Sequence, residues 1–167
     1  MLFVSAGCKV TGIDIRDMRK PEFIGKFNFI MADGRKLLFE SQAFDVVVSF
    51  DVIEHVDDED LLLDEAYRVL QKDGIFILGT PNRNRLSHKL RKMLRRKIRY
   101  PLKLEENCIH VREYTMSELI ELVENAGFKK IRDEYVWFGL VGIGGFKCFP
   151  PLFDRWFQYL VIFAVRP

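Results

Sequence analysis

The chain has 167 residues, of which 49% are hydrophobic and 30% are charged, which is enough for one ordinary globular domain with a buried core. Its three cysteines (Cys8, Cys108 and Cys148) are far apart and odd in number, which excludes a disulfide framework and a paired-cysteine metal site and favours the reducing cytoplasm. No run of 18 apolar residues occurs, so we expect no transmembrane helix.

The net charge is only +2, but the charges are unevenly placed. Residues 83–103 hold ten Lys or Arg and no acid, which leaves 16 basic against 24 acidic residues in the rest of the chain. One basic block on an acidic body predicts a local contact surface and disfavours a general nucleic-acid-binding domain.

Two short strands are predicted near the start of the chain. Residues 1–7 read as the end of a helix, with Gly7 just past it, and residues 8–15 as a strand that carries Asp14 at its carboxyl end. A carboxylate there can accept hydrogen bonds from both hydroxyls of a ribose, or it can cap a turn. Residues 27–31 read as the second strand, and the Asp33-Gly34 pair after it is also a common turn.

The most informative stretch is residues 44–56, which read FDVVVSFDVIEHV. The apolar run to Phe50 is typical of a strand that is buried on both faces. Asp51, Glu54 and His55 follow where that strand ends. Open parallel sheets bind ligands at the carboxyl ends of their strands, so we expect these groups at a ligand crevice. The alternative is a buried strand followed by an ordinary capped helix.

A helix capped by Asp57 or Asp58 and ending near Gln71 is predicted next, followed by a strand over residues 74–79. Residues 83–104 form an insertion with the pattern of a basic amphipathic helix, with apolar residues at Leu86, Leu90, Met93, Leu94 and Ile98. Three interpretations stay open: a solvated helix packed over the domain, a lid that attracts an anionic substrate, and a contact for an anionic membrane surface. Nucleic acid is disfavoured, because no aromatic residues alternate with these charges.

The last third of the chain predicts one helix and two strands. Thr115 to Glu118 is a capping box for a helix that ends near Asn125, with Gly127 beyond it. Residues 128–136 and 159–165 read as strands. The aromatic and glycine-rich residues 137–157 between them could form the floor of a substrate pocket, a membrane-dipping loop, or a hairpin on the core.

FDVVVSFDVIEHV, together with RVLQKDG, GIFILGTPN and REYTMSELIELVENAGF, closely resembles the class I S-adenosylmethionine-dependent methyltransferases of the small-molecule branch. The resemblance covers roughly residues 7–131. It implies an α/β fold with a Rossmann-like, mostly parallel sheet and an antiparallel edge hairpin, in a single domain over 1–167 with the basic insertion at about 83–104. The family's first strand and glycine-rich loop would precede residue 1. This leaves a gap between the strands ending at Asp14 and Phe50, which we expect to close by direct pairing or by self-association as a homodimer.

The resemblance also implies roles for individual residues. S-adenosylmethionine would be the cofactor, with Asp14 on its ribose, Asp33 on its adenine and Gly34 beside the ring. The full set of cofactor-binding residues that it implies is Asp14, Ile15, Asp33, Gly34, Ser49, Phe50 and Asp51. His55 and His110 are the candidate catalytic bases, because histidine titrates near neutrality, although His55 could equally be structural. No metal is expected.

We therefore expect an S-adenosylmethionine-dependent methyltransferase that acts on a small or lipid-like acceptor, in the cytoplasm or associated with a membrane. The alternative is a noncatalytic or incomplete methyltransferase-like binding protein. A nicotinamide-dependent oxidoreductase fits less well, because the EHV turn and the terminal pair of strands suit the methyltransferase plan better.

Overall fold

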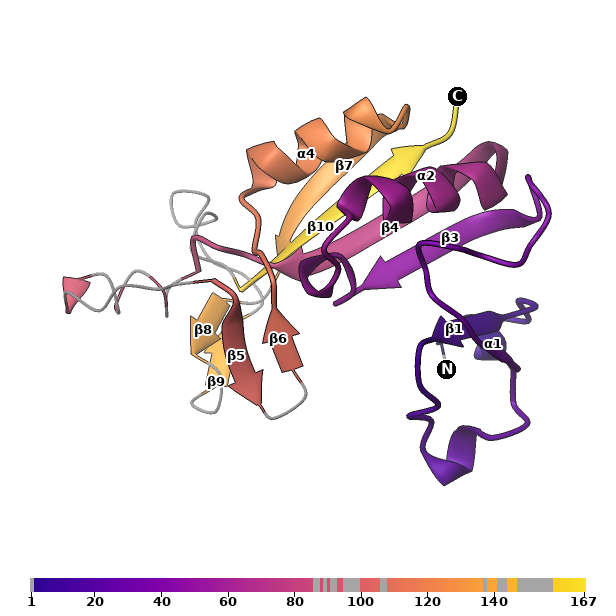
Figure 1. The fold of residues 1–167 in the computed structure, drawn as a ribbon, viewed down its shortest axis with the longest axis horizontal. Helices are drawn as coiled ribbons and strands as arrows, with labels where there is room; N and C mark the ends of the chain where they lie inside the picture. Colours follow the sequence, from indigo (N-terminus) through magenta and orange to yellow (C-terminus); the bar gives the residue numbers. More distant parts are fainter. Residues whose placement is uncertain are drawn as a thin grey trace.

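The computed structural model describes residues 2–85, 88, 90, 93–94, 100–105, 108–136, 138–140, 144–146 and 158–167. Helices α2 and α4 lie over one face of a four-stranded sheet (Figure 1). A small two-stranded sheet, formed near the start of the chain, stands apart from it and is called the small sheet below. In this part of the chain, no helix is both long and apolar enough to cross a membrane.

The small sheet is formed by the first residues of the chain. Helix α1 (Leu2–Ser5) ends before Gly7, whose φ of 81° suits glycine. Strand β1 (Thr11–Asp14) pairs in parallel with β2 (Asn28–Met31), and the connection between them contains only the short 3₁₀ helix η1 (Pro21–Phe23). The predicted strands are confirmed at shorter lengths.

The four-stranded sheet has the order β3-β4-β10-β7. Strand β3 (Phe44–Phe50) runs parallel to β4 (Leu70–Pro81), and β10 (Tyr159–Val165) is antiparallel to both β4 and β7 (Lys129–Val136). This confirms the expected antiparallel pair of final strands at one edge.

The core lies between this sheet and two helices that begin at the predicted caps. Asp58 accepts a hydrogen bond from Leu61 N at the start of α2 (Glu59–Val69), and Thr115 and Glu118 form the predicted capping box of α4 (Met116–Asn125). Side chains of both helices pack on alternate residues of β4 and β10; the fully buried members include Leu63, Leu119, Val123, Phe76, Leu78, Leu160 and Ile162. The opposite face of β3 carries half-exposed apolar side chains at Val46, Val48 and Phe50.

Among the described residues β1 does not pair with β3, so the expectation of direct pairing is wrong. The segment that joins β2 to β3 is held on α2 instead. Glu65 accepts a hydrogen bond from Leu37 N at 2.6 Å, and Arg68 donates to the carbonyls of Leu37 and Phe39. These contacts fix the path of the chain between the two sheets, and within the described residues β1 pairs only with β2 and β3 only with β4. Self-association remains a prediction.

The structure contains two further antiparallel strand pairs, of which the first was not predicted and the second is a hairpin of the kind left open for residues 137–157. Strand β5 (Leu102–Glu105), which overlaps the end of the basic insertion, pairs antiparallel with β6 (Cys108–His110), and β8 (Phe138–Leu140) pairs antiparallel with β9 (Gly144–Phe146) within the aromatic segment. Ten residues of the predicted basic insertion at 83–104, and most of residues 137–157, lie outside the described residues.

Candidate active site

A sharp turn follows β3 and carries the acidic and imidazole groups that the sequence singled out. Asp51 adopts a left-handed φ of 53°, and the chain then forms the 3₁₀ helix η2 (Ile53–His55). The Glu54 side chain is fully buried, and its Oε2 accepts a hydrogen bond from Thr80 Oγ1, near the end of β4, at 2.8 Å. The turn is therefore tied to the neighbouring strand through a buried carboxylate.

The same turn is tied to the chain on both sides of His110. The Glu54 carbonyl accepts hydrogen bonds from Val111 N at 2.8 Å and from Arg112 N at 3.4 Å. His55 Nδ1 bonds the Ile109 carbonyl at 2.8 Å. These bonds bring His55 and His110 together, with ring centroids 4.9 Å apart, so the two predicted catalytic histidines share one site.

The tautomer of each ring follows from its Nδ1 partner. A carbonyl oxygen can only accept, so His55 Nδ1 carries a proton and donates it to Ile109 O. His110 Nδ1 donates in the same way to Glu113 Oε1 at 2.7 Å. In the tautomer that these bonds select, the Nε2 atom of each ring keeps its lone pair for another partner.

Glu113 was not identified from the sequence, yet it organises one side of the site. Its buried carboxylate accepts two hydrogen bonds from Arg85, each at 2.7 Å, and one from Tyr100 Oη at 2.9 Å. Burial alone would raise the pKa of Glu113, but the hydrogen bonds from His110 and Arg85 outweigh it and hold that pKa at about 2. Glu113 is thus ionised at neutral pH and fixes the His110 ring.

The pKa of Glu54 shifts in the opposite direction. Burial raises its pKa against the opposing effect of its backbone and Thr80 hydrogen bonds, and the nearby charge of Asp51 raises it further. The second carboxylate oxygen, Oε1, is buried and has no hydrogen-bond partner within the described structure. It lies 4.0 Å from His55 Nε2.

The predicted cofactor carboxylates Asp14 and Asp33 lie at neighbouring strand ends in the small sheet. Ala32 N donates to the Asp14 carbonyl at 3.0 Å, and Asp14 Oδ1 accepts from Arg16 N at 3.0 Å, so Asp14 also caps its own turn. Asp33 forms an ion pair with Arg35 at 2.7 Å, and this hydrogen bonding lowers the pKa of Asp33. Their ribose and adenine roles remain predictions.

The other predicted cofactor residues are split between the two sheets. Ile15, beside Asp14, is 62% exposed, and a Cβ placed on Gly34 would lie 2.8 Å from Leu62 Cδ1, so that turn packs closely on α2. Ser49 and Phe50 end β3, and Ser49 Oγ is buried without a partner in the described structure. In the described structure, no strand pairing connects β1, which ends at Asp14, to β3, which leads into Asp51.

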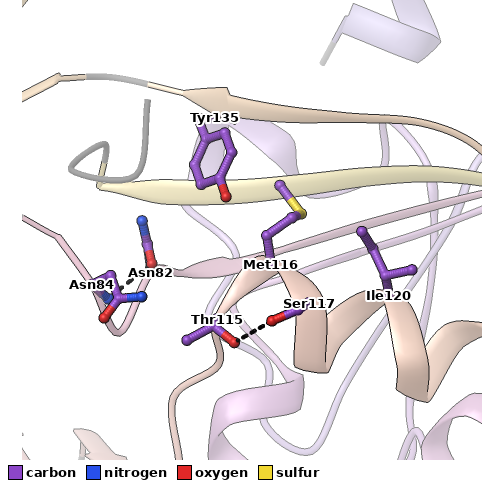
Figure 2. Close-up of a pocket in the computed structure, with 7 residues that line it drawn as sticks. All are labelled: Asn82, Asn84, Thr115, Met116, Ser117, Ile120 and Tyr135. Atoms are coloured by element: carbon purple, nitrogen blue, oxygen red, sulfur yellow. Dashed lines mark hydrogen bonds between the residues drawn. The ribbon is translucent and has the colours of Figure 1, made fainter. Parts of the chain in front are cut away.

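A separate pocket of about 420 Å³ opens between the loop after β4, the first turns of α4 and β7 (Figure 2). It is lined by Asn82, Asn84, Thr115, Met116, Ser117, Ile120 and Tyr135. It contains none of the predicted site residues, and we place the chemistry at the histidine pair because the buried polar groups converge there.

Comparison with known proteins gives a family match. A family model described as a methyltransferase domain matches residues 2–132. A probable S-adenosylmethionine-dependent methyltransferase of Mycolicibacterium smegmatis is 40% identical over 85 residues, which cover 51% of this chain and 28% of that protein. A ubiquinone biosynthesis O-methyltransferase of Pelagibacter ubique is 30% identical over 88 residues, covering 49% of this chain and 37% of its own length. The matched part thus spans only about a third of these relatives.

Solved structures agree on the fold. A SAM-dependent methyltransferase from Thermotoga maritima superposes with a TM-score of 0.70 at 21% identity, over 99% of this chain and 76% of the other. A 1,6-didemethyltoxoflavin-N1-methyltransferase of Burkholderia thailandensis, solved with S-adenosylhomocysteine, gives a TM-score of 0.62 at 20% identity, over 99% of this chain and 64% of the other. At these identities the likeness shows the fold alone.

We predict that Glu113→Gln lowers the free energy of unfolding by about 2–3 kcal/mol at pH 7, because Arg85 and His110 lose a buried anionic partner. Since the folded-state pKa is depressed, this stabilisation is present above the ordinary value of 4.5 and is lost as the pH falls toward about 2. Urea unfolding at pH 7 and pH 3 should therefore show a smaller difference between variant and parent at pH 3. Glu121→Gln, on the exposed side of α4, is the control and should change stability by less than about 0.5 kcal/mol. An equal loss at both pH values would contradict the prediction.

Proposed function

This chain belongs to the methyltransferase domain family, and from that premise we propose that it binds S-adenosylmethionine and transfers its methyl group to a small or lipid-like acceptor. The observation that supports this most directly is the meeting of His55 and His110 at the carboxyl end of β3. Both rings keep an Nε2 lone pair there, next to the buried carboxylate of Glu54. An Nε2 atom in this position can accept a proton from a nucleophile.

The proposed reaction is a displacement at the methyl carbon. A hydroxyl oxygen or another nucleophilic atom of the acceptor bonds to that carbon while the carbon–sulfur bond breaks, and sulfur keeps the electron pair in S-adenosylhomocysteine. The acceptor's proton passes to a histidine Nε2. Because the sulfonium is already activated, the protein mainly positions the two reactants and excludes water.

A second candidate is a noncatalytic methyltransferase-like binding protein. The unpaired edges of β1 and β3 favour it, since the predicted cofactor residues lie on two sheets that do not pair within the described structure. The two candidates differ in whether methyl groups are transferred, and not in whether S-adenosylmethionine binds.

We predict that the protein transfers label from methyl-labelled S-adenosylmethionine to a component of a cell extract. The extract is divided into a lipid fraction and an aqueous small-molecule fraction, and the labelled fraction identifies the acceptor class. His55→Ala should lower the rate by about 10²-fold or more, as for loss of a general base. Binding of S-adenosylmethionine without transfer to either fraction would instead support the noncatalytic candidate.

We predict that Asp14→Ala weakens S-adenosylmethionine binding by roughly 5- to 150-fold, since a lost hydrogen bond to a buried polar ligand group costs about 1–3 kcal/mol. Isothermal titration calorimetry measures this directly. Asp17→Ala is the matched control, because Asp17 lies in the same exposed loop and binds Arg19 instead. Equal affinity of the Asp14 variant and the parent would remove the ribose assignment.

We further propose that the basic residues of 83–103 contact an anionic surface, which would bring a lipid-like acceptor to the site. Sedimentation with vesicles of anionic phospholipid should show binding at low salt that weakens at high salt. The triple variant Arg95→Ser, Arg96→Ser, Lys97→Ser should bind less than a control triple variant in which Lys9, Lys20 and Lys26 are replaced by Ser. Equal binding by both variants would contradict a specific contact.

A further inference from the structure

Three potential metal ligands converge at the end of β3. Glu54, His55 and His110 each offer one ligand atom, and these atoms all lie within 4.8 Å of one another. Glu54 Oε1 is fully buried and unpartnered in the described structure, and it faces His55 Nε2 at 4.0 Å. A buried carboxylate oxygen without a hydrogen bond is costly, so the arrangement calls for a positively charged or donating partner.

From this geometry we propose that Glu54 Oε1 and the Nε2 atoms of His55 and His110 form a binding site for a divalent first-row transition-metal ion such as Zn²⁺. Two imidazoles and one carboxylate are a common ligand set for such ions, and three protein ligands leave a coordination position open.

The surroundings of the two rings support metal binding more than a simple ion pair. Histidine ligands usually donate their second ring N–H to a carboxylate or a backbone carbonyl, which fixes the tautomer and directs the other nitrogen at the metal. Both patterns occur here: His110 donates to the ionised Glu113, and His55 donates to the Ile109 carbonyl. Glu54 is likewise held by Thr80 through its other oxygen.

The site needs only a small contraction to hold the ion. Tetrahedral ligands at the usual zinc distances are about 3.4 Å apart, so ligand atoms within 4.8 Å of one another have to approach by roughly 1 Å. His55 can supply this movement, because its side chain is 33% exposed, whereas Glu54 is fully buried. The exposed side of His55 also gives the ion a path from solvent.

Metal binding goes beyond the proposed methyl transfer and does not depend on it. In the metal-loaded protein neither Nε2 can take a proton. A hydroxyl bound at the open position would instead lose its proton more readily, because a bound divalent ion lowers its pKa. The metal-free and the metal-loaded protein would therefore both activate the acceptor at Glu54, His55 and His110.

The test measures Zn²⁺ and Co²⁺ binding by chelator-treated protein in the absence of S-adenosylmethionine and any acceptor. Calorimetry should show one Zn²⁺ per chain, and Co²⁺ should give visible absorption typical of nitrogen and oxygen ligands. His55→Ala and Glu54→Gln should each weaken binding at least tenfold, with circular dichroism showing that the fold is kept. Affinity should also fall as the pH is lowered, because protons compete with the metal ion for the imidazole nitrogens.

Glu121→Gln is the control, since Glu121 lies on the exposed side of α4 and outside the proposed ligand set. It should bind within about twofold of the parent. The proposal is overturned if the parent binds neither ion, if a folded His55→Ala variant binds as tightly as the parent, or if the Co²⁺ spectrum shows a thiolate charge-transfer band, which would assign binding to a cysteine. Each of these outcomes leaves the methyl-transfer proposal intact, because the assay contains no methyl donor.

Discussion

The buried Glu54 carboxylate is the constraint on which the site depends. Burying a carboxylate costs several kcal/mol unless it is hydrogen-bonded or paired, and here one oxygen is bonded to Thr80 while the other is left for a further partner. The backbone carbonyl of the same residue accepts the hydrogen bonds that hold Val111 and Arg112. One residue therefore fixes the end of β3, the end of β4 and the approach of His110, which explains how the two histidines meet although they are far apart in the sequence.

The separation into two sheets has a different physical basis. An unpaired strand edge costs about 1–3 kcal/mol for each backbone group that is buried without a partner, but little where water reaches the edge. No residue of β3 is buried, and Val46, Val48 and Phe50 are half-exposed, so water reaches this strand in the described structure. Most buried residues of the core come from α2, α4, β4 and β10, and from β3 only the partly buried Val47 packs against it in the described structure.

Local patterns predicted most of the fold, and long-range contacts account for what was missed. The caps at Asp58 and Thr115, the turn at Gly127 and the strand over 159–165 each depend on a few neighbouring residues, and each appears as expected. The hairpin of β5 and β6 was missed because its first strand overlaps the end of the basic insertion and has no turn signal of its own. Glu113 was missed for a related reason: its partners Arg85 and Tyr100 reach it only through the tertiary fold. Asp33 is different, because its ion-pair partner Arg35 is only two residues away, so this contact is local in the sequence.

These contacts also connect the basic segment to the histidine pair. Arg85 lies near the start of the basic residues, and its two terminal nitrogens bond the two oxygens of Glu113, of which Oε1 also holds His110. Moving the segment away from the body would break two charge-assisted hydrogen bonds and leave a buried anion facing the imidazole, at a cost of about 3–5 kcal/mol. The segment is therefore anchored at its first residues, directly beside the site.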